Sequence, residues 1–130
     1  MDTSAAIALL DEAHPGYAAT YRETRGLILG LAGHAMFETY SVLTRLPGEK
    51  RLGAGTAAHL IAHEFPGSAA LPPAEFDDAL TRLAAAGIAG GSVYDGLVGL
   101  AAQAAGIQLL SRDRRAAPIY AVLGVAFRLL

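Results

Sequence analysis

The stretch Ile107-Gln108-Leu109-Leu110-Ser111-Arg112-Asp113 passes directly from an apolar run to a hydroxyl and two charged side chains. A short continuous apolar run is typical of a strand that is buried on both faces of a sheet. Comparable runs occupy residues 27–31, 68–71 and 125–129. Short buried strands separated by helices predict a parallel sheet covered on both faces, which is the α/β class.

Helical patterns fill the spaces between these runs. We expect helices over residues 3–10, 15–24, 35–46, 56–65, 73–86 and 92–105. Proline and glycine punctuate most of their ends. The helix over 73–86 is amphipathic, and its pattern predicts Phe76, Leu80 and Leu83 in the core.

Composition limits the class of protein. The chain has 130 residues, enough for one domain with one core, and 53% of them are hydrophobic. This apolar share is high for a small domain, so we expect a partner or a self-interface. A net charge of −2 excludes a polycationic nucleic-acid coat, and the lack of cysteine excludes disulfides and Cys-ligated zinc.

Nothing in the sequence predicts export or membrane insertion. The amino end lacks the basic and apolar regions of a secretory signal. No apolar run approaches the roughly 20 residues that span a bilayer. We therefore expect a cytoplasmic protein with no membrane partner.

Four acids stand where predicted strands end or predicted helices begin: Asp2, Glu38, Asp95 and Asp113. Ligands of open parallel sheets bind beyond the carboxyl ends of the strands, so the four can share one cleft. Clustered carboxylates repel one another, and hard divalent cations relieve that repulsion. Each acid also has a structural explanation. Asp2 can cap the first helix, and Ser92-x-x-Asp95 matches a capping box.

The sequence segments around these acids resemble those of a known family. The chain is similar to PIN domains, specifically the VapC-type ribonuclease toxins of bacterial toxin–antitoxin pairs. The resembling stretches are residues 2–10, 37–46, 92–97 and 109–115, and in this order they cover nearly the whole chain.

The resemblance implies a single PIN-like domain over residues 1–130, with a three-layer α/β/α fold and a mostly parallel sheet. It implies that the four acids bind Mg²⁺ or Mn²⁺, and that the hydroxyls of Ser4 and Ser111 support the metal ligands. The expected substrate is transfer or ribosomal RNA, and the expected partners are a cognate antitoxin and a second copy in a homodimer. The chemistry agrees, since divalent ions can stabilise both the attacking and the leaving oxygen of a phosphodiester. All-oxygen ligation favours Mg²⁺ or Mn²⁺ over zinc.

Four arginines are expected to contact RNA phosphates. Arg112, Arg114 and Arg115 flank Asp113, and Arg45 lies two helical turns after Glu38. The alternative for the first three is a solvated turn.

Other observations keep alternatives open. Only Met1 precedes Asp2, whereas family members carry several apolar residues there, so we expect weaker stability and metal binding than in an extended form. The alternative function is a degenerate, non-catalytic PIN fold that binds an antitoxin or RNA. A phosphatase of the haloacid-dehalogenase type is disfavoured, because Ser4 stands where its second acid would be. His59-x-x-x-His63 has zinc-binding spacing but no evident third ligand, which favours a polar helix face.

Overall fold

The computed structural model describes residues 1–130 as seven α-helices, one short 3-10 helix and two β-strands. Their bounds are α1 Thr3–Leu10, α2 Tyr17–Thr24, α3 Ala35–Arg45, η1 Gly48–Lys50, α4 Ala54–Glu64, α5 Pro73–Ala85, α6 Ser92–Ala104, β1 Leu109–Ser111, α7 Ala117–Val122 and β2 Phe127–Leu129. All six predicted helices are present, and no end is shifted by more than two residues. None of the helices combines the length and apolar character needed to cross a membrane.

The sheet is parallel and is extended by short backbone segments. β1 pairs in parallel with β2. On its other side, the Asp2 amide donates to the Leu110 carbonyl at 3.0 Å, and the Ala32 amide donates to the Met1 carbonyl at 3.2 Å. A parallel bridge joins Ala32 to Ala69. Five stretches therefore lie side by side in the order β2, β1, residues 1–2, 29–32 and 67–69, which confirms the α/β prediction.

The prediction of a regular strand over residues 27–31 was wrong. Only Ala32 forms a bridge, and Ile28 is 87% exposed. The physical reason is that the backbone bonds to the central stretch reach only the last residues of this segment. The Met1 amino group donates to the Gly30 carbonyl, and the Met1 carbonyl accepts from Ala32. These contacts reach only the end of the segment. Leu27 and Ile28 therefore form no backbone hydrogen bonds with residues 1–2.

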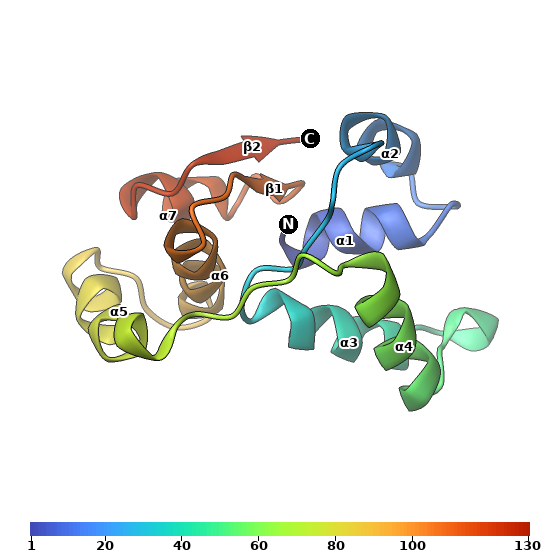
Figure 1. The fold of residues 1–130 in the computed structure, drawn as a ribbon, viewed down its shortest axis with the longest axis horizontal. Helices are drawn as coiled ribbons and strands as arrows, with labels where there is room; N and C mark the ends of the chain where they lie inside the picture. The colour runs from blue at the N-terminus through green and yellow to red at the C-terminus, as the bar shows by residue number, and fades with distance from the viewer.

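Successive side chains along the sheet point to opposite faces, and each face packs into its own apolar core. Leu110 and Leu31 belong to a core formed with α1, α3 and α4, whereas Leu109 and Ala32 belong to a core formed with α5, α6 and α7. Figure 1 shows these two groups of helices on either side of the short strands. The arrangement is the three-layer α/β/α fold, and it places the carboxyl ends of the strands between the starts of α1, α3 and α6.

Two details of the helices differ from expectation. Helix α5 packs through Ala79 and Leu83, whereas Phe76 is 65% exposed and Leu80 is 74% exposed. The apolar stripe of α5 is thus wider than the surface that α6 covers, and the prediction that all three large side chains are inward was wrong. Helix α7, only six residues long, was not predicted, because fewer than two turns carry too little periodicity to detect.

Candidate active site

The four acids come from four separate elements and meet at one edge of the sheet. Asp2 precedes α1, Glu38 lies in the first turn of α3, Asp95 lies in the first turn of α6, and Asp113 follows β1. Their nearness is visible in the pKa of Asp95, which is raised by burial and then by the charges of the other three acids. The structure thus brings the predicted acids together.

Asp2 is 5% exposed and is held at both oxygens. Its Oδ1 accepts hydrogen bonds from the Ser4 hydroxyl at 2.7 Å and the Ala5 amide at 3.0 Å, and its Oδ2 accepts one from the Tyr120 hydroxyl at 3.2 Å. Asp2 therefore caps α1, and its charge also contributes to the raised pKa of Asp95. Burial and the Asp2 and Asp95 charges raise the pKa of Tyr120, which keeps its hydroxyl protonated as a donor.

Two serine hydroxyls tie the loop after β1 to the start of α1. The Ser4 hydroxyl accepts a hydrogen bond from the Arg112 amide at 2.8 Å, in addition to donating to Asp2. The fully buried Ser111 hydroxyl accepts one from the Asp113 amide at 3.0 Å. Both hydroxyls thus fix the backbone that carries Asp2 and Asp113, and their support of metal ligands stays a prediction.

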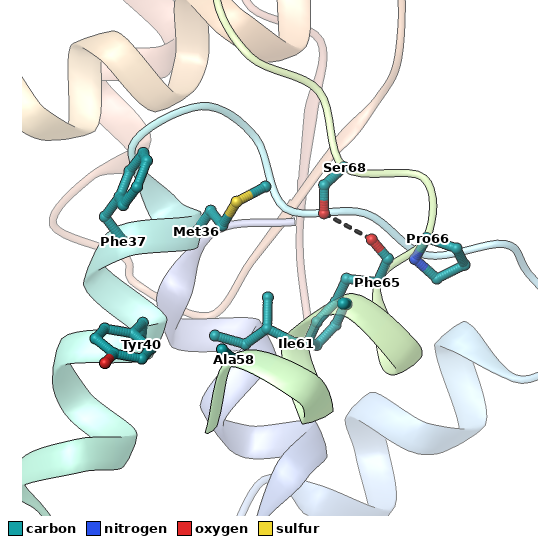
Figure 2. A pocket seen from close by; sticks show the side chains of 9 residues that line it. Met36, Phe37, Tyr40, Ala58, Ile61, Phe65, Pro66 and Ser68 are labelled. Atoms are coloured by element: carbon teal, nitrogen blue, oxygen red, sulfur yellow. Dashed lines mark hydrogen bonds between the residues drawn. The ribbon is translucent and has the colours of Figure 1, made fainter. Parts of the chain in front are cut away.

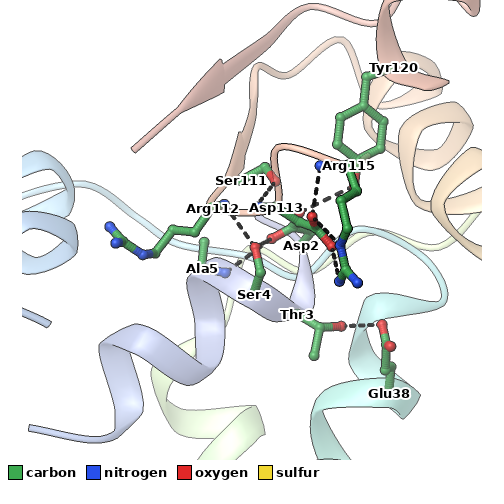
Figure 3. Close-up of polar contacts among 10 residues, drawn as sticks. All are labelled: Asp2, Thr3, Ser4, Ala5, Glu38, Ser111, Arg112, Asp113, Arg115 and Tyr120. Atoms are coloured by element: carbon green, nitrogen blue, oxygen red, sulfur yellow. Dashed lines mark hydrogen bonds and ion pairs between the residues drawn. The ribbon is translucent and has the colours of Figure 1, made fainter. Parts of the chain in front are cut away.

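Glu38 is exposed on α3 and is oriented from α1. The Thr3 hydroxyl donates to its Oε2 at 2.6 Å, as Figure 3 shows. Thr3 was not singled out in the sequence. A hydroxyl directly after an acid at a helix start is too common to be a signal.

Asp95 has no capping role. Helix α6 begins at Ser92, its N-cap is Gly91, and no side chain caps it, so the predicted capping box is wrong. The turn before the helix is closed instead by the amides of Val93 and Tyr94, which donate to the carbonyls of Gly90 and Gly91. Asp95 therefore has no role as a cap, and burial followed by the charges of the other three acids raises its pKa.

Asp113 forms a bidentate ion pair with Arg115. Its Oδ1 accepts from the Arg115 amide at 2.8 Å and from Nε at 3.0 Å, and its Oδ2 lies 2.8 Å from a terminal guanidinium nitrogen. This pair lowers the pKa of Asp113, the side-chain hydrogen bond being the largest cause. Arg115 thus supplies positive charge at the rim of the acid cluster.

The other predicted arginines lie differently. Figure 3 shows Arg112 extending away from Asp113. Its guanidinium reaches the Thr20 hydroxyl of α2 at 3.4 Å. Arg114 is exposed beside Asp113. Arg45 is exposed at the far end of α3, about 10 Å along the helix from Glu38. The structure brings Arg115 to the acids and leaves Arg112 and Arg45 apart from them.

The donor set fits a hard divalent cation by its chemistry. The acids and the serine hydroxyls offer only oxygen, and the mutual repulsion felt at Asp95 is what a cation relieves. As they stand, no three metal-ligating side chains anywhere in the chain are close enough to bind one ion. Releasing Asp113 from Arg115 is the rearrangement that would free two further oxygens. The His59 and His63 pair gains no third ligand, and His63 instead contacts Glu64 at 3.0 Å.

Comparison with known proteins decides the family. A protein-family model of the PIN domain matches residues 1–122. The chain belongs to the PIN-domain family. This PIN domain is 42% identical over 125 residues to Ribonuclease VapC27 of Mycobacterium tuberculosis strain H37Rv, covering 96% of this chain and 91% of the relative. It is 40% identical over 132 residues to Ribonuclease VapC40 of strain CDC 1551, covering 99% and 96%. The similarity over nearly full length places it among VapC-type PIN domains.

Proposed function

We propose that this PIN domain is a Mg²⁺- or Mn²⁺-dependent endoribonuclease, the toxin of a toxin–antitoxin pair acting on cytoplasmic RNA. Asp2, Glu38, Asp95 and Asp113 are the proposed metal-binding and catalytic residues. The observation that carries the proposal is the placement of four acids from four separate elements at one edge of the sheet. The pKa of Asp95, raised first by burial and then by the other three acids, supports it. The relatives named ribonucleases support the choice of substrate.

The chain's own residues would hold and orient the acids. When bound, the cation supplies a Lewis acid and an activated water. Ser4 and Tyr120 fix the direction of the Asp2 oxygens, and Thr3 does the same for Glu38. Such fixed ligands lower the cost of organising the site during the reaction.

The arginines after Asp113 would approach the RNA. The Arg115 guanidinium is exposed and planar, and a guanidinium can exchange a carboxylate for a phosphate with the same bidentate geometry. Its release from Asp113 would free that acid for the cation. Arg114 is exposed next to it and would contact a neighbouring phosphate.

An apolar groove beside the acids would receive the antitoxin. Met36, Phe37 and Tyr40 of α3 line a space of about 490 Å³, which Ile61 and Phe65 line from the α4 side (Figure 2). Helix α3 also carries Glu38, so a chain seated here would end close to the acids. The exposed Phe76 and Leu80 of α5 are the surface we assign to a homodimer.

One observation favours the second candidate, a non-catalytic module that binds RNA or an antitoxin. The bidentate pair of Arg115 with Asp113 occupies both oxygens of a required acid. In this alternative the pair persists, and the site never gathers enough ligands to bind a cation.

Cleavage of RNA separates the two candidates. We expect the purified protein to cut RNA with added Mn²⁺ and not with EDTA. Asp95→Asn should abolish cleavage, and Asp77→Asn, the same charge change on the exposed face of α5, should retain it. Cleavage that survives Asp95→Asn would show that the site is wrong, and no cleavage by the wild type at any Mn²⁺ concentration would favour the binding module.

A further inference from the structure

Two aromatic rings stack at the rim of the acid cluster, outside every contact described above. The rings of His34 and Tyr94 have centroids 4.8 Å apart and an interplanar angle of 23°. His34 immediately precedes α3 and lies one helical turn before Glu38, while Tyr94 immediately precedes Asp95. The Tyr94 side chain is 55% exposed although it belongs to an otherwise well-packed helix.

We propose that the His34–Tyr94 pair is a binding site for an unpaired nucleobase adjoining the phosphate that is cut. The inference rests on the proposed ribonuclease function and adds to it a base-stacking subsite. The occupant is the flat face of a base, which would lie on the exposed Tyr94 ring and lengthen the stack to three members.

The chemistry of the pair matches that ligand. Nucleic-acid-binding proteins hold single strands by stacking bases on aromatic side chains, and the contact is tolerant of base identity because every base has a π-face. Tyr94 is already held flat by His34 on one side, so little side-chain freedom remains to be lost when a base binds. A site that only bound an apolar group would not need the plane of the Tyr94 ring to be fixed.

The position of the pair relates it to the reacting phosphate. Consecutive residues of a helix point about 100° apart, so Tyr94 lies beside Asp95 rather than inside the acid cluster. His34 and Glu38 are separated by four residues, about 6 Å along the helix. The platform is therefore about one helical turn from the acids, near enough for a base whose own phosphate sits among them.

This placement predicts selection for RNA that is unpaired at the cleavage point. A base within a duplex has both faces covered by its neighbours and cannot stack on Tyr94 without leaving the helix. Loops and single strands offer that face freely. The pair would thus favour single-stranded stretches without reading their sequence.

Two variants separate base stacking from a purely structural brace between α3 and α6. Tyr94→Phe keeps the aromatic face, and Tyr94→Leu keeps apolar bulk without it. We would measure kcat/KM in Mn²⁺ on a short oligoribonucleotide, and on a series in which each nucleotide near the cut is made abasic in turn. Thermal unfolding of each variant controls for folding.

We expect one abasic position next to the cut to lower kcat/KM of the wild type about tenfold or more, with Tyr94→Phe behaving alike. Tyr94→Leu should lose a similar factor on the intact substrate and almost nothing further on that abasic one, since both changes remove the same contact. Equal losses at every position, or losses that multiply, would overturn the inference. So would a Tyr94→Leu protein with unchanged kcat/KM.

Binding without cleavage keeps this test independent of the proposed activity. Fluorescence anisotropy with a labelled single strand, and with the same strand in a duplex, should show a single-strand preference that Tyr94→Leu loses and Tyr94→Phe keeps. If the wild type binds this way but never cleaves, the proposed function fails and the subsite stands. If it cleaves but the single-strand preference is unaffected by Tyr94→Leu, the subsite fails alone.

Discussion

Replacing Asp95 by asparagine should make the metal-free protein more stable while removing its activity. The substitution is nearly isosteric and deletes one charge. The pKa of Asp95 is raised above its ordinary 3.8 by burial and by Asp113, Glu38 and Asp2, and Arg115 opposes this only weakly. The ionised carboxylate therefore destabilises the folded state, and the neutral asparagine side chain does not.

The pH dependence follows from the direction of that shift. The folded protein holds the Asp95 proton to higher pH than the unfolded chain does, so stability falls as the pH rises from about 3.8 through the raised pKa. At neutral pH the full cost is present. Asp95 is only partly buried, and screened interactions between such groups are each about 0.2–1 kcal/mol. Burial and the three screened repulsions, with one partial offset, together cost about 1 kcal/mol, which for this size is about 4 °C in Tm.

A divalent cation should make the wild type more stable than the Asp95→Asn protein. At a concentration of 100 times its Kd, Mn²⁺ would stabilise the wild type by about 2.7 kcal/mol, and Asp95→Asn, lacking a ligand, much less. Differential scanning calorimetry at pH 7 in EDTA and then in Mn²⁺ measures both effects. Asp77→Asn, with the same change in net charge on exposed α5, is the matched control.

Two results would refute this reasoning. In EDTA, an Asp95→Asn protein no more stable than Asp77→Asn would mean that the acids do not repel one another at Asp95. In Mn²⁺, equal stabilisation of the wild type and Asp95→Asn would mean that Asp95 does not bind the cation.

Three further substitutions test the supporting contacts. Thr39→Val should stabilise the protein by about 1 kcal/mol in urea unfolding, because the buried Thr39 hydroxyl has no hydrogen-bond partner; a loss of stability would reveal an unseen partner. Tyr120→Phe should cost about 1.5–3 kcal/mol in the same assay and weaken Mn²⁺ binding, since the buried Asp2 loses a donor; an unchanged stability would contradict that contact. Arg115→Gln should let the pKa of Asp113 rise toward its ordinary value, remove the stability that this acid contributes above that value, and tighten Mn²⁺ binding in calorimetric titration. Weaker Mn²⁺ binding would show that Arg115 does not compete with the cation.

The acid cluster was predictable because a general rule places strand ends together. Asp113 follows a recognisable strand, and the breakers in the sequence located the starts of α1, α3 and α6 within two residues. The contact of Tyr120 with Asp2 joins residues 118 apart in sequence, and no local pattern encodes such a distance.

The arginines show a second limit of sequence reasoning. Arg112 and Arg115 are chemically identical and flank the same acid, yet one extends toward α2 and the other binds Asp113. The directions are set by the alternation of side chains at the end of β1 and the turn that follows it. Similarly, the period of α5 predicted an apolar stripe, while the width of the neighbouring α6 decided that Phe76 and Leu80 remain exposed.

The division of the acids along the chain has a practical consequence. Asp2 and Glu38 lie before the connection between α4 and α5 (Figure 1), where Ala70 is exposed, and Asp95 and Asp113 lie after it. Each side also supplies most of one apolar core. Under the proposed function, cutting the gene at this connection would yield two inactive halves that regain a complete set of acids only on reassembly, so that RNA cleavage could report whether two fused proteins meet.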